Sequence, residues 1–180
     1  MGDSSTPETA ARALSIPLQR DDFHRTLIRE LIGTLQDVVG QEEAAGFVSI
    51  VGQRIGDQID AIYRSALGVE RLSRAQVTEV LVDLERRIEG EFSVIEKNDE
   101  KIVLGNRTCS LDEPVIDRPA MEMIIANVLG VIAAENLGYS KIVLEEAIVQ
   151  GVPRRQVVIY LKPTLEAEAA QGREFFQGIG

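Results

Sequence analysis

The side chain with the widest chemical capacity in this sequence is the single cysteine, Cys109, in the stretch GNRTCSLDEP at residues 105–114. A cysteine thiolate can act as a nucleophile or bind a soft metal ion when neighbouring groups lower its pKa. The nearest basic residue in the sequence is Arg107, two positions away, which is weak support for such a shift. A free cysteine otherwise behaves as a small buried apolar side chain. Composition favours this inert interpretation, and the functional one stays open.

Other residue types that carry out catalysis show no pattern that would bring them together. The only histidine, His24, has no second histidine or cysteine at the spacing of metal ligands, and we interpret it as a solvated side chain. Glu145 and Glu146 are adjacent in a predicted strand, so they point to opposite faces and cannot act as a pair. The sequence contains no nucleophile elbow, no Walker motif and no dinucleotide fingerprint. We therefore predict no catalytic residue, no metal site and no cofactor.

Charge and hydropathy exclude further classes of protein. The formal net charge of −10 repels nucleic acid and anionic membrane surfaces, and the basic residues are scattered apart from doublets at 86–87 and 154–155. No apolar run approaches the roughly 18 residues that span a bilayer. The N-terminus lacks the basic start and apolar block of a signal peptide. We expect a cytoplasmic protein that binds neither nucleic acid nor membrane.

Apolar residues at three- and four-residue spacing predict four helices that must position these side chains. The helices cover residues 21–40, 42–67, 72–90 and 118–138. Ser73, followed three residues later by Gln76, forms a capping box at the start of the third helix. Gly40 and Gly138 suit the ends of the first and fourth helices. The fourth helix is apolar nearly all round, so we expect it to be buried.

Three glycines interrupt the second helix, at Gly46, Gly52 and Gly56. Each costs about 1 kcal/mol relative to alanine in a helix interior, so close approach of another backbone is expected to offset the cost. Gly52 and Gly56 are four residues apart and share a helix face. We predict a tight helix crossing there, either within the subunit or across a dimer axis.

Short segments rich in β-branched residues predict four strands, at 91–97, 101–106, 139–151 and 154–163. Sequential strands joined by short turns favour two hairpins, with the fourth helix between them. The fold class is therefore α+β, with N-terminal helices followed by a four-stranded antiparallel sheet. Residues 1–20 are expected to be a flexible arm, 21–163 a single domain, and 164–180 a flexible, weakly ordered tail whose two phenylalanines could dock on an unspecified surface.

Three stretches resemble the methanogen output domain family: VGQRIGDQI, LGNRTCSLDEP and PAMEMIIANVLGVIAAENLGYSKIVLEEAIVQGVPRRQVVIYLKP. The resemblance covers about residues 21–163, and that family is similar to 4-vinyl-reductase-like domains, a fold group linked to nitric-oxide signalling and Golgi transport. It implies an α+β domain that dimerises through its N-terminal helices and works in bacterial or archaeal signal transduction. It does not imply catalysis. The wider group binds small hydrophobic molecules or serves as a protein-interaction platform.

The sequence departs from the family pattern at its cysteines. In the family that this chain resembles, many members carry three cysteines in this region, and here only Cys109 is kept. Glu122 stands where the second cysteine would lie, early in the fourth helix, and Arg155 stands where the third would lie, at the start of the last strand. A thiolate metal or iron–sulfur site needs several such ligands, so we expect that site to be dismantled. Glu122 and Arg155 could instead form an ion pair, and Cys109 would be a remnant.

These observations favour a non-catalytic signalling domain that acts as a homodimer and binds an unidentified signalling protein. The interface is expected on the first two helices, at the following positions: Leu27, Leu31, Val51, Gly52, Ile55 and Gly56. A partner surface of this kind is normally an exposed apolar patch with a polar rim.

Two alternatives remain. One is a sensor that binds a small apolar ligand between the second and fourth helices, in a pocket lined by Cys109, Glu122, Asn127, Arg155 and Tyr160. The alternative to a pocket is an ordinary hydrophobic core, in which Asn127 would form hydrogen bonds only with backbone groups. The other, weaker alternative is a vinyl-reductase-type enzyme, for which the sequence offers no cofactor motif.

Overall fold

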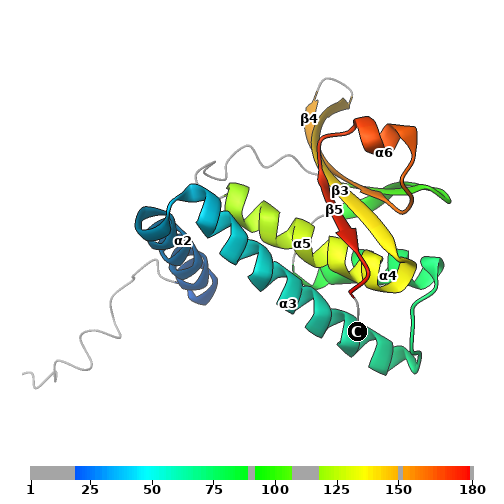
Figure 1. Ribbon diagram of the computed structural model, residues 1–180, viewed down its shortest axis with the longest axis horizontal. Helices are drawn as coiled ribbons and strands as arrows, with labels where there is room; N and C mark the ends of the chain where they lie inside the picture. The colour runs from blue at the N-terminus through cyan, green and yellow to red at the C-terminus, as the bar shows by residue number, and fades with distance from the viewer. Residues whose placement is uncertain (1–18, 89–91, 107–117, 150–151, 179–180) are drawn as a thin grey trace, which may run out of the picture.

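The computed structural model describes residues 19–88, 92–106, 118–149 and 152–178 of the chain (Figure 1). Its elements run in the order α2 (Arg20–Val39), α3 (Gln41–Leu67), α4 (Arg74–Arg87), β1 (Phe92–Lys97), β2 (Lys101–Asn106), α5 (Arg118–Leu137), β3 (Tyr139–Val149), β4 (Val152–Tyr160), α6 (Leu165–Ala169) and β5 (Arg173–Phe176). The predicted α+β class is confirmed, with helices first and an antiparallel sheet after them.

Both predicted hairpins form, and they join into one antiparallel sheet with the strand order β1-β2-β4-β3-β5. The two hairpins meet where β2 pairs with β4, and Ile159 lies opposite both Ile102 and Ile142. This central row lies in the main core. Because every register is antiparallel, each strand presents alternate residues to its two faces.

The fifth strand corrects the prediction of a weakly ordered tail. Residues 164–178 form α6 and then β5, which pairs with the edge of β3. Thr164 caps α6 by accepting a hydrogen bond from the backbone N–H of Ala167 at 3.1 Å. Phe175 packs against α5 at Gly130, where an added Cβ would lie 2.4 Å from its ring. The aromatic docking expected of the tail is thus made by Phe175.

The sheet separates two apolar layers. One face carries Ile102, Leu104, Val157 and Ile159, and it packs on α4 and α5. The other face packs on Ala167 of α6, and its buried members are Val103, Val143, Val158 and Tyr160. The predicted burial of the fourth helix is confirmed, because α5 is enclosed between the sheet and α3.

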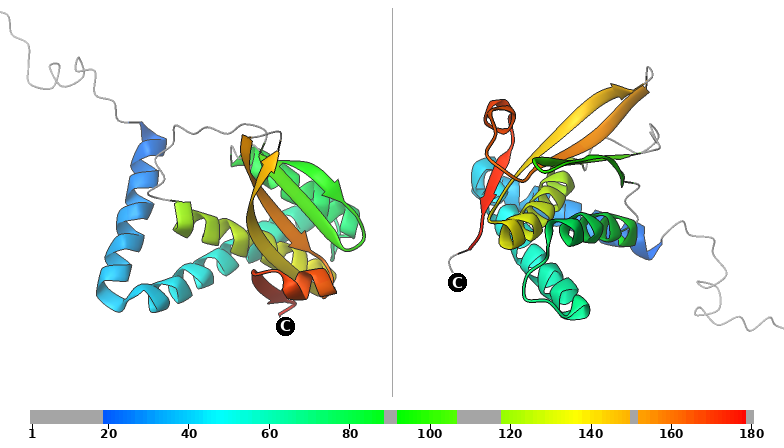
Figure 2. Two further views of the ribbon diagram at one scale, coloured as in Figure 1. Left: turned by 90° about the horizontal axis from the view of Figure 1, so that it is seen from above. Right: turned by 90° about the vertical axis from the view of Figure 1, so that its right-hand side faces the viewer.

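The helical ends follow the sequence signals. Gly40 and Gly138 take φ angles of 89° and 92°, a region that favours glycine, at the ends of α2 and α5. The capping box is present, since the backbone N–H of Ser73 donates to Gln76 Oε1 at 2.8 Å and the reciprocal bond is also made. The turn at Gly40 directs α2 away from the sheet, so α2 packs near the start of α3 and otherwise projects outwards (Figure 2).

Candidate functional site

The glycine crossing predicted in the second helix is present, between α3 and α5 of the same chain. A Cβ added at Gly52 would lie 2.6 Å from the Cβ of Asn127, and one added at Gly56 would lie 2.9 Å from the Cβ of Val131. No side chain larger than hydrogen fits at either position without movement of α5. Of the two alternatives for this crossing, the structure shows the one within the subunit. This corrects the assignment of Gly52 and Gly56 to an interface between subunits.

Asn127 behaves as a satisfied core residue. Its side chain is buried on α5, and its Nδ2 donates to the backbone oxygen of Met123 at 2.6 Å. A hydrogen bond to its own helix is what plain core would require. The described residues therefore favour core over a ligand pocket at the crossing of α3 with α5.

Tyr160 lies on the opposite face of the sheet from Asn127, so the two polar groups proposed for one pocket do not converge. Its hydroxyl donates to Glu166 Oε1 at 3.1 Å, and Lys101 Nζ approaches the same oxygen at 2.7 Å. Burial, followed by the hydrogen bond to Glu166, raises the pKa of Tyr160. This polar group fastens α6 to the sheet.

The remaining predicted site residues fall where the structure describes no side chain. Cys109 lies outside the described residues altogether. Glu122 and Arg155 belong to α5 and β4, but the positions of their side chains are not described. The ion pair between them and the role of Cys109 therefore stay predictions.

The N-terminal helices expose two apolar stripes, which we call the exposed helical stripes. Their members are Phe23, Leu27, Leu31 and Val38 on α2, and Phe47, Val51, Ile55 and Ile62 on α3. All four of the larger residues predicted for a dimer interface, Leu27, Leu31, Val51 and Ile55, belong to them. The α3 stripe lies on a different helix face from the glycines, which contact α5. Large apolar side chains aligned in this way on a surface are typical of interaction sites in general.

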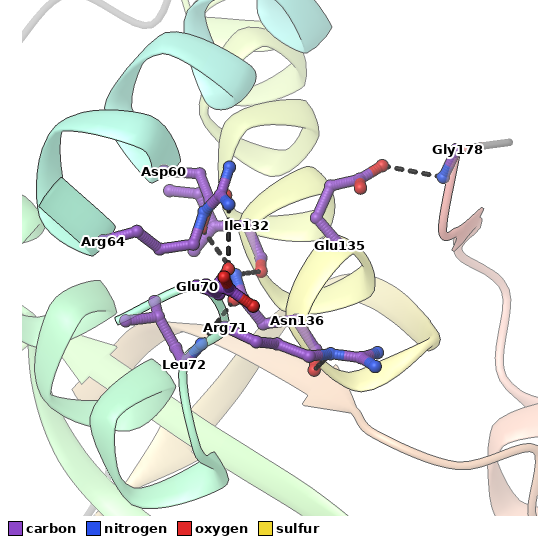
Figure 3. A network of polar contacts seen from close by, with 9 residues as sticks. All are labelled: Asp60, Arg64, Glu70, Arg71, Leu72, Ile132, Glu135, Asn136 and Gly178. Carbon is purple, nitrogen blue, oxygen red and sulfur yellow. Dashed lines mark hydrogen bonds and ion pairs between the residues drawn. The ribbon is translucent and has the colours of Figure 1, made fainter. Parts of the chain in front are cut away.

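A buried polar network centred on Asn136 was not predicted (Figure 3). Its Nδ2 donates to Asp60 Oδ1 at 2.5 Å and to the backbone oxygen of Ile132 at 2.9 Å. Its Oδ1 accepts from the backbone N–H of Leu72 at 2.7 Å. Asp60 also pairs with Arg64, whose Nε lies 2.7 Å from Oδ2. The network thus joins α3, the connection between α3 and α4, and α5.

The same network reaches the C-terminal segment. Arg71 donates to the backbone oxygen of Asn136 at 2.5 Å and to Gln177 Oε1 at 3.3 Å. The backbone N–H of Gly178 donates to Glu135 Oε1 at 2.8 Å (Figure 3). Burial, with the carboxylates of Glu135 and Asp60, raises the pKa of Asp57 nearby. These contacts join α5, the α3–α4 connection and the segment that follows β5.

Within the described ranges, no group of three or more histidine, cysteine, aspartate or glutamate side chains is arranged to hold a metal ion. Among the helices that the structure describes, none combines the length and apolar character needed to cross a membrane.

Comparison with protein families gives one match, to the family model described as Methanogen output domain 1, over residues 27–160. The match begins within α2 and ends with the last residue of β4, so it includes both hairpins and the α3–α5 crossing. The elements α6 and β5 lie beyond it. No curated protein and no solved structure gives a significant match.

Proposed function

Since the chain belongs to the methanogen output domain 1 family, we propose that it is a non-catalytic signalling domain that acts as a homodimer and passes its signal on by binding another protein. The family description supports a signalling output module in general terms. The proposal adds that the chain forms a dimer, that it binds a protein partner and that it catalyses no reaction.

The observation that carries the proposal is the pair of exposed helical stripes. Helices in water gain most of their stability from packing an apolar face, yet α2 leaves Leu27 and Leu31 in solvent. Each large apolar side chain that becomes buried contributes roughly 1.5–3 kcal/mol. A second copy of the chain is a suitable cover, because a two-fold axis would place the same stripes of both chains against each other.

Single charges placed in the stripes test the dimer. We expect Leu31→Asp and Val51→Asp to convert a dimeric protein into monomers in sedimentation velocity, because each would bury a carboxylate in an apolar interface. Leu165→Asp is the matched control, since Leu165 is exposed on α6 outside the stripes. Circular dichroism would establish that the variants keep their helices. A wild-type protein that stays monomeric at all concentrations would contradict the proposal.

The absence of catalysis has its own test. A vinyl-reductase-type reaction needs a source of electrons or hydride, and the sequence carries no cofactor motif that would supply one. We expect the purified protein to be colourless. An absorbance band in the visible range that co-purifies with the chain would overturn this part of the proposal.

A further inference from the structure

Glu85 lies on the core-facing side of α4, where a charged side chain is out of place. Only 1% of its surface is exposed, and the neighbouring Leu81 and Leu84 on the same helix belong to the main core. Within the part of the chain that the structure describes, its Oε1 is the only buried side-chain nitrogen or oxygen atom without a hydrogen-bond partner. Buried polar groups in folded proteins are nearly always paired, so this exception calls for an explanation.

Among the residues that the structure describes, no neighbouring charge compensates Glu85. The element α4 packs on α5 and β1, and it also contacts α3 through Tyr63. Titratable groups on these elements and on α4 itself comprise Glu42, Glu43, Arg54, Asp57, Asp60, Tyr63 and Arg64 on α3, Arg74, Glu79, Asp83, Arg86 and Arg87 on α4, Glu96 and Lys97 on β1, and Arg118, Glu122 and Glu135 on α5. No ion pair joins any described side chain among them to Glu85, and burial is the sole cause acting on its protonation.

The nearest charged groups on α4 are engaged elsewhere. Asp83 accepts from Tyr63 and pairs with Arg87, on the side of the helix that faces α3. Arg74 donates to Asp99 Oδ1 at 2.8 Å, which fixes the start of α4 beside the β1–β2 turn. These contacts hold the helix in place and do not involve Glu85, whose carboxyl lies in the core.

A carboxylate removed from water without a partner is strongly unfavourable, and protonation removes the charge. Burial accordingly raises the pKa of Glu85 to about 7, from an ordinary value of 4.5. The neutral acid is therefore the form that the folded core accommodates, and ionisation acts against it.

We propose that Glu85 is a proton-binding site that keeps α4 packed on the sheet when it is protonated and loosens that packing when it ionises. The domain would then respond to pH in the neutral range. Loosening of α4 would act on α3, because the hydrogen bond from Tyr63 to Asp83 joins the two helices. The inference goes beyond the signalling role and holds whether or not the chain dimerises.

The sign of the pH effect follows from the two pKa values. The folded state holds the Glu85 proton more tightly than the unfolded state, so the contribution of Glu85 to stability is greatest below pH 4.5 and falls as the pH rises through 7. Between pH 5 and pH 8 the unfolding equilibrium constant is expected to rise roughly 70-fold, from values of 4.5 unfolded and about 7 folded.

Urea denaturation from pH 5 to pH 8 tests the inference in three proteins. In the wild type we expect the fall in stability described above. In Glu85→Gln we expect this rise in the unfolding constant between pH 5 and pH 8 to be smaller than in the wild type by a factor of roughly 70. The reason is that the two proteins share every other titratable group. Glu79→Gln is the matched control, since Glu79 lies on the exposed side of the same helix. It should keep the wild-type pH dependence.

Two measurements keep the test decisive. If Glu85→Gln does not fold, Glu85→Leu takes its place, because it removes the polar atoms altogether. Carbon-13 NMR of the wild-type Glu85 carboxyl should show its titration near pH 7, and hydrogen exchange in α4 should quicken over the same range. A carboxyl that titrates near 4.5, or equal pH profiles for the wild type and the Glu85 variant, would overturn the proposal.

Discussion

Within the part of the interior that the structure describes, the side chain of Asn136 makes three hydrogen bonds. It supplies the acceptor for Leu72 and a donor for Asp60, which is itself 2% exposed. We expect Asn136→Ala to lower the free energy of unfolding by about 3 kcal/mol, because it leaves a buried backbone N–H unpaired and a buried carboxylate with one partner fewer. Urea denaturation would measure the loss.

Gln58→Ala is a suitable control for that change, because Gln58 is an exposed position of α3. Its effect should stay within about 0.5 kcal/mol, as for other surface substitutions. If Asn136→Ala lowers the free energy of unfolding no more than this control does, the network orients α3, the α3–α4 connection and α5 without stabilising the fold.

Single residues differ in how far the sequence reveals them. Gly52 and Gly56 were recognisable, because glycine inside an apolar helix has a local cost that only close packing offsets. Glu85 carries a weaker signal, since it follows Leu81 by four residues and so falls on the core side of α4. A long side chain at such a position often reaches solvent, and the sequence does not show that the carboxyl of Glu85 stays buried. Asn136 has no local signal, because its partners lie 64 and 76 residues away.

At the scale of the helix, the crossing of α3 with α5 makes opposite predictions for two glycines of α3. Gly56→Ala should destabilise the protein by about 2 kcal/mol, because the new methyl group would overlap Val131. Gly46→Ala should stabilise it by up to about 1 kcal/mol, because an added Cβ there meets nothing within 4 Å. Thermal denaturation of both variants would test the pair. Equal changes in stability for the two variants would show that α3 and α5 pack less closely at Gly56 than the structure indicates.

Helices and hairpins were predictable because their signals are local, whereas β5 was not. Apolar periodicity and turn residues place α2 to α5 and β1 to β4 close to their observed bounds. The strand β5 has four residues, REFF, which is too short for a clear alternation. It forms because β3 offers an unpaired edge and Phe175 finds the notch at Gly130, and both partners are distant in sequence.

The charge of the whole molecule affects the proposed dimer. Each chain carries a net charge of −10, so two chains repel each other while their apolar stripes attract. We expect the dimer to tighten when sodium chloride is raised from about 20 mM to about 300 mM, because the added salt screens the repulsion. Sedimentation equilibrium at both concentrations would measure the dissociation constant. A dimer that weakens with salt would instead point to an interface held by ion pairs.

The overall class followed from the order of elements, since sequential strands with short turns allow few arrangements. The candidate pocket did not follow in the same way. Whether side chains on α5 and β4 converge depends on which face of the sheet each one occupies, and Tyr160 lies on the face away from Asn127. A shift of one residue in a strand reverses that choice, and sequence spacing alone does not determine it.

The outer edge of β1 bears on how the protein behaves at high concentration. β1 ends the strand order of the described sheet, and its pairing with β2 shifts register between Val94 and Glu96. A bulge of this kind twists the strand, and the charges of Glu96 and Lys97 oppose the addition of another strand. Edge-to-edge growth into fibres is therefore disfavoured. Self-association through the helical side, as proposed above, would close at two copies and would not continue.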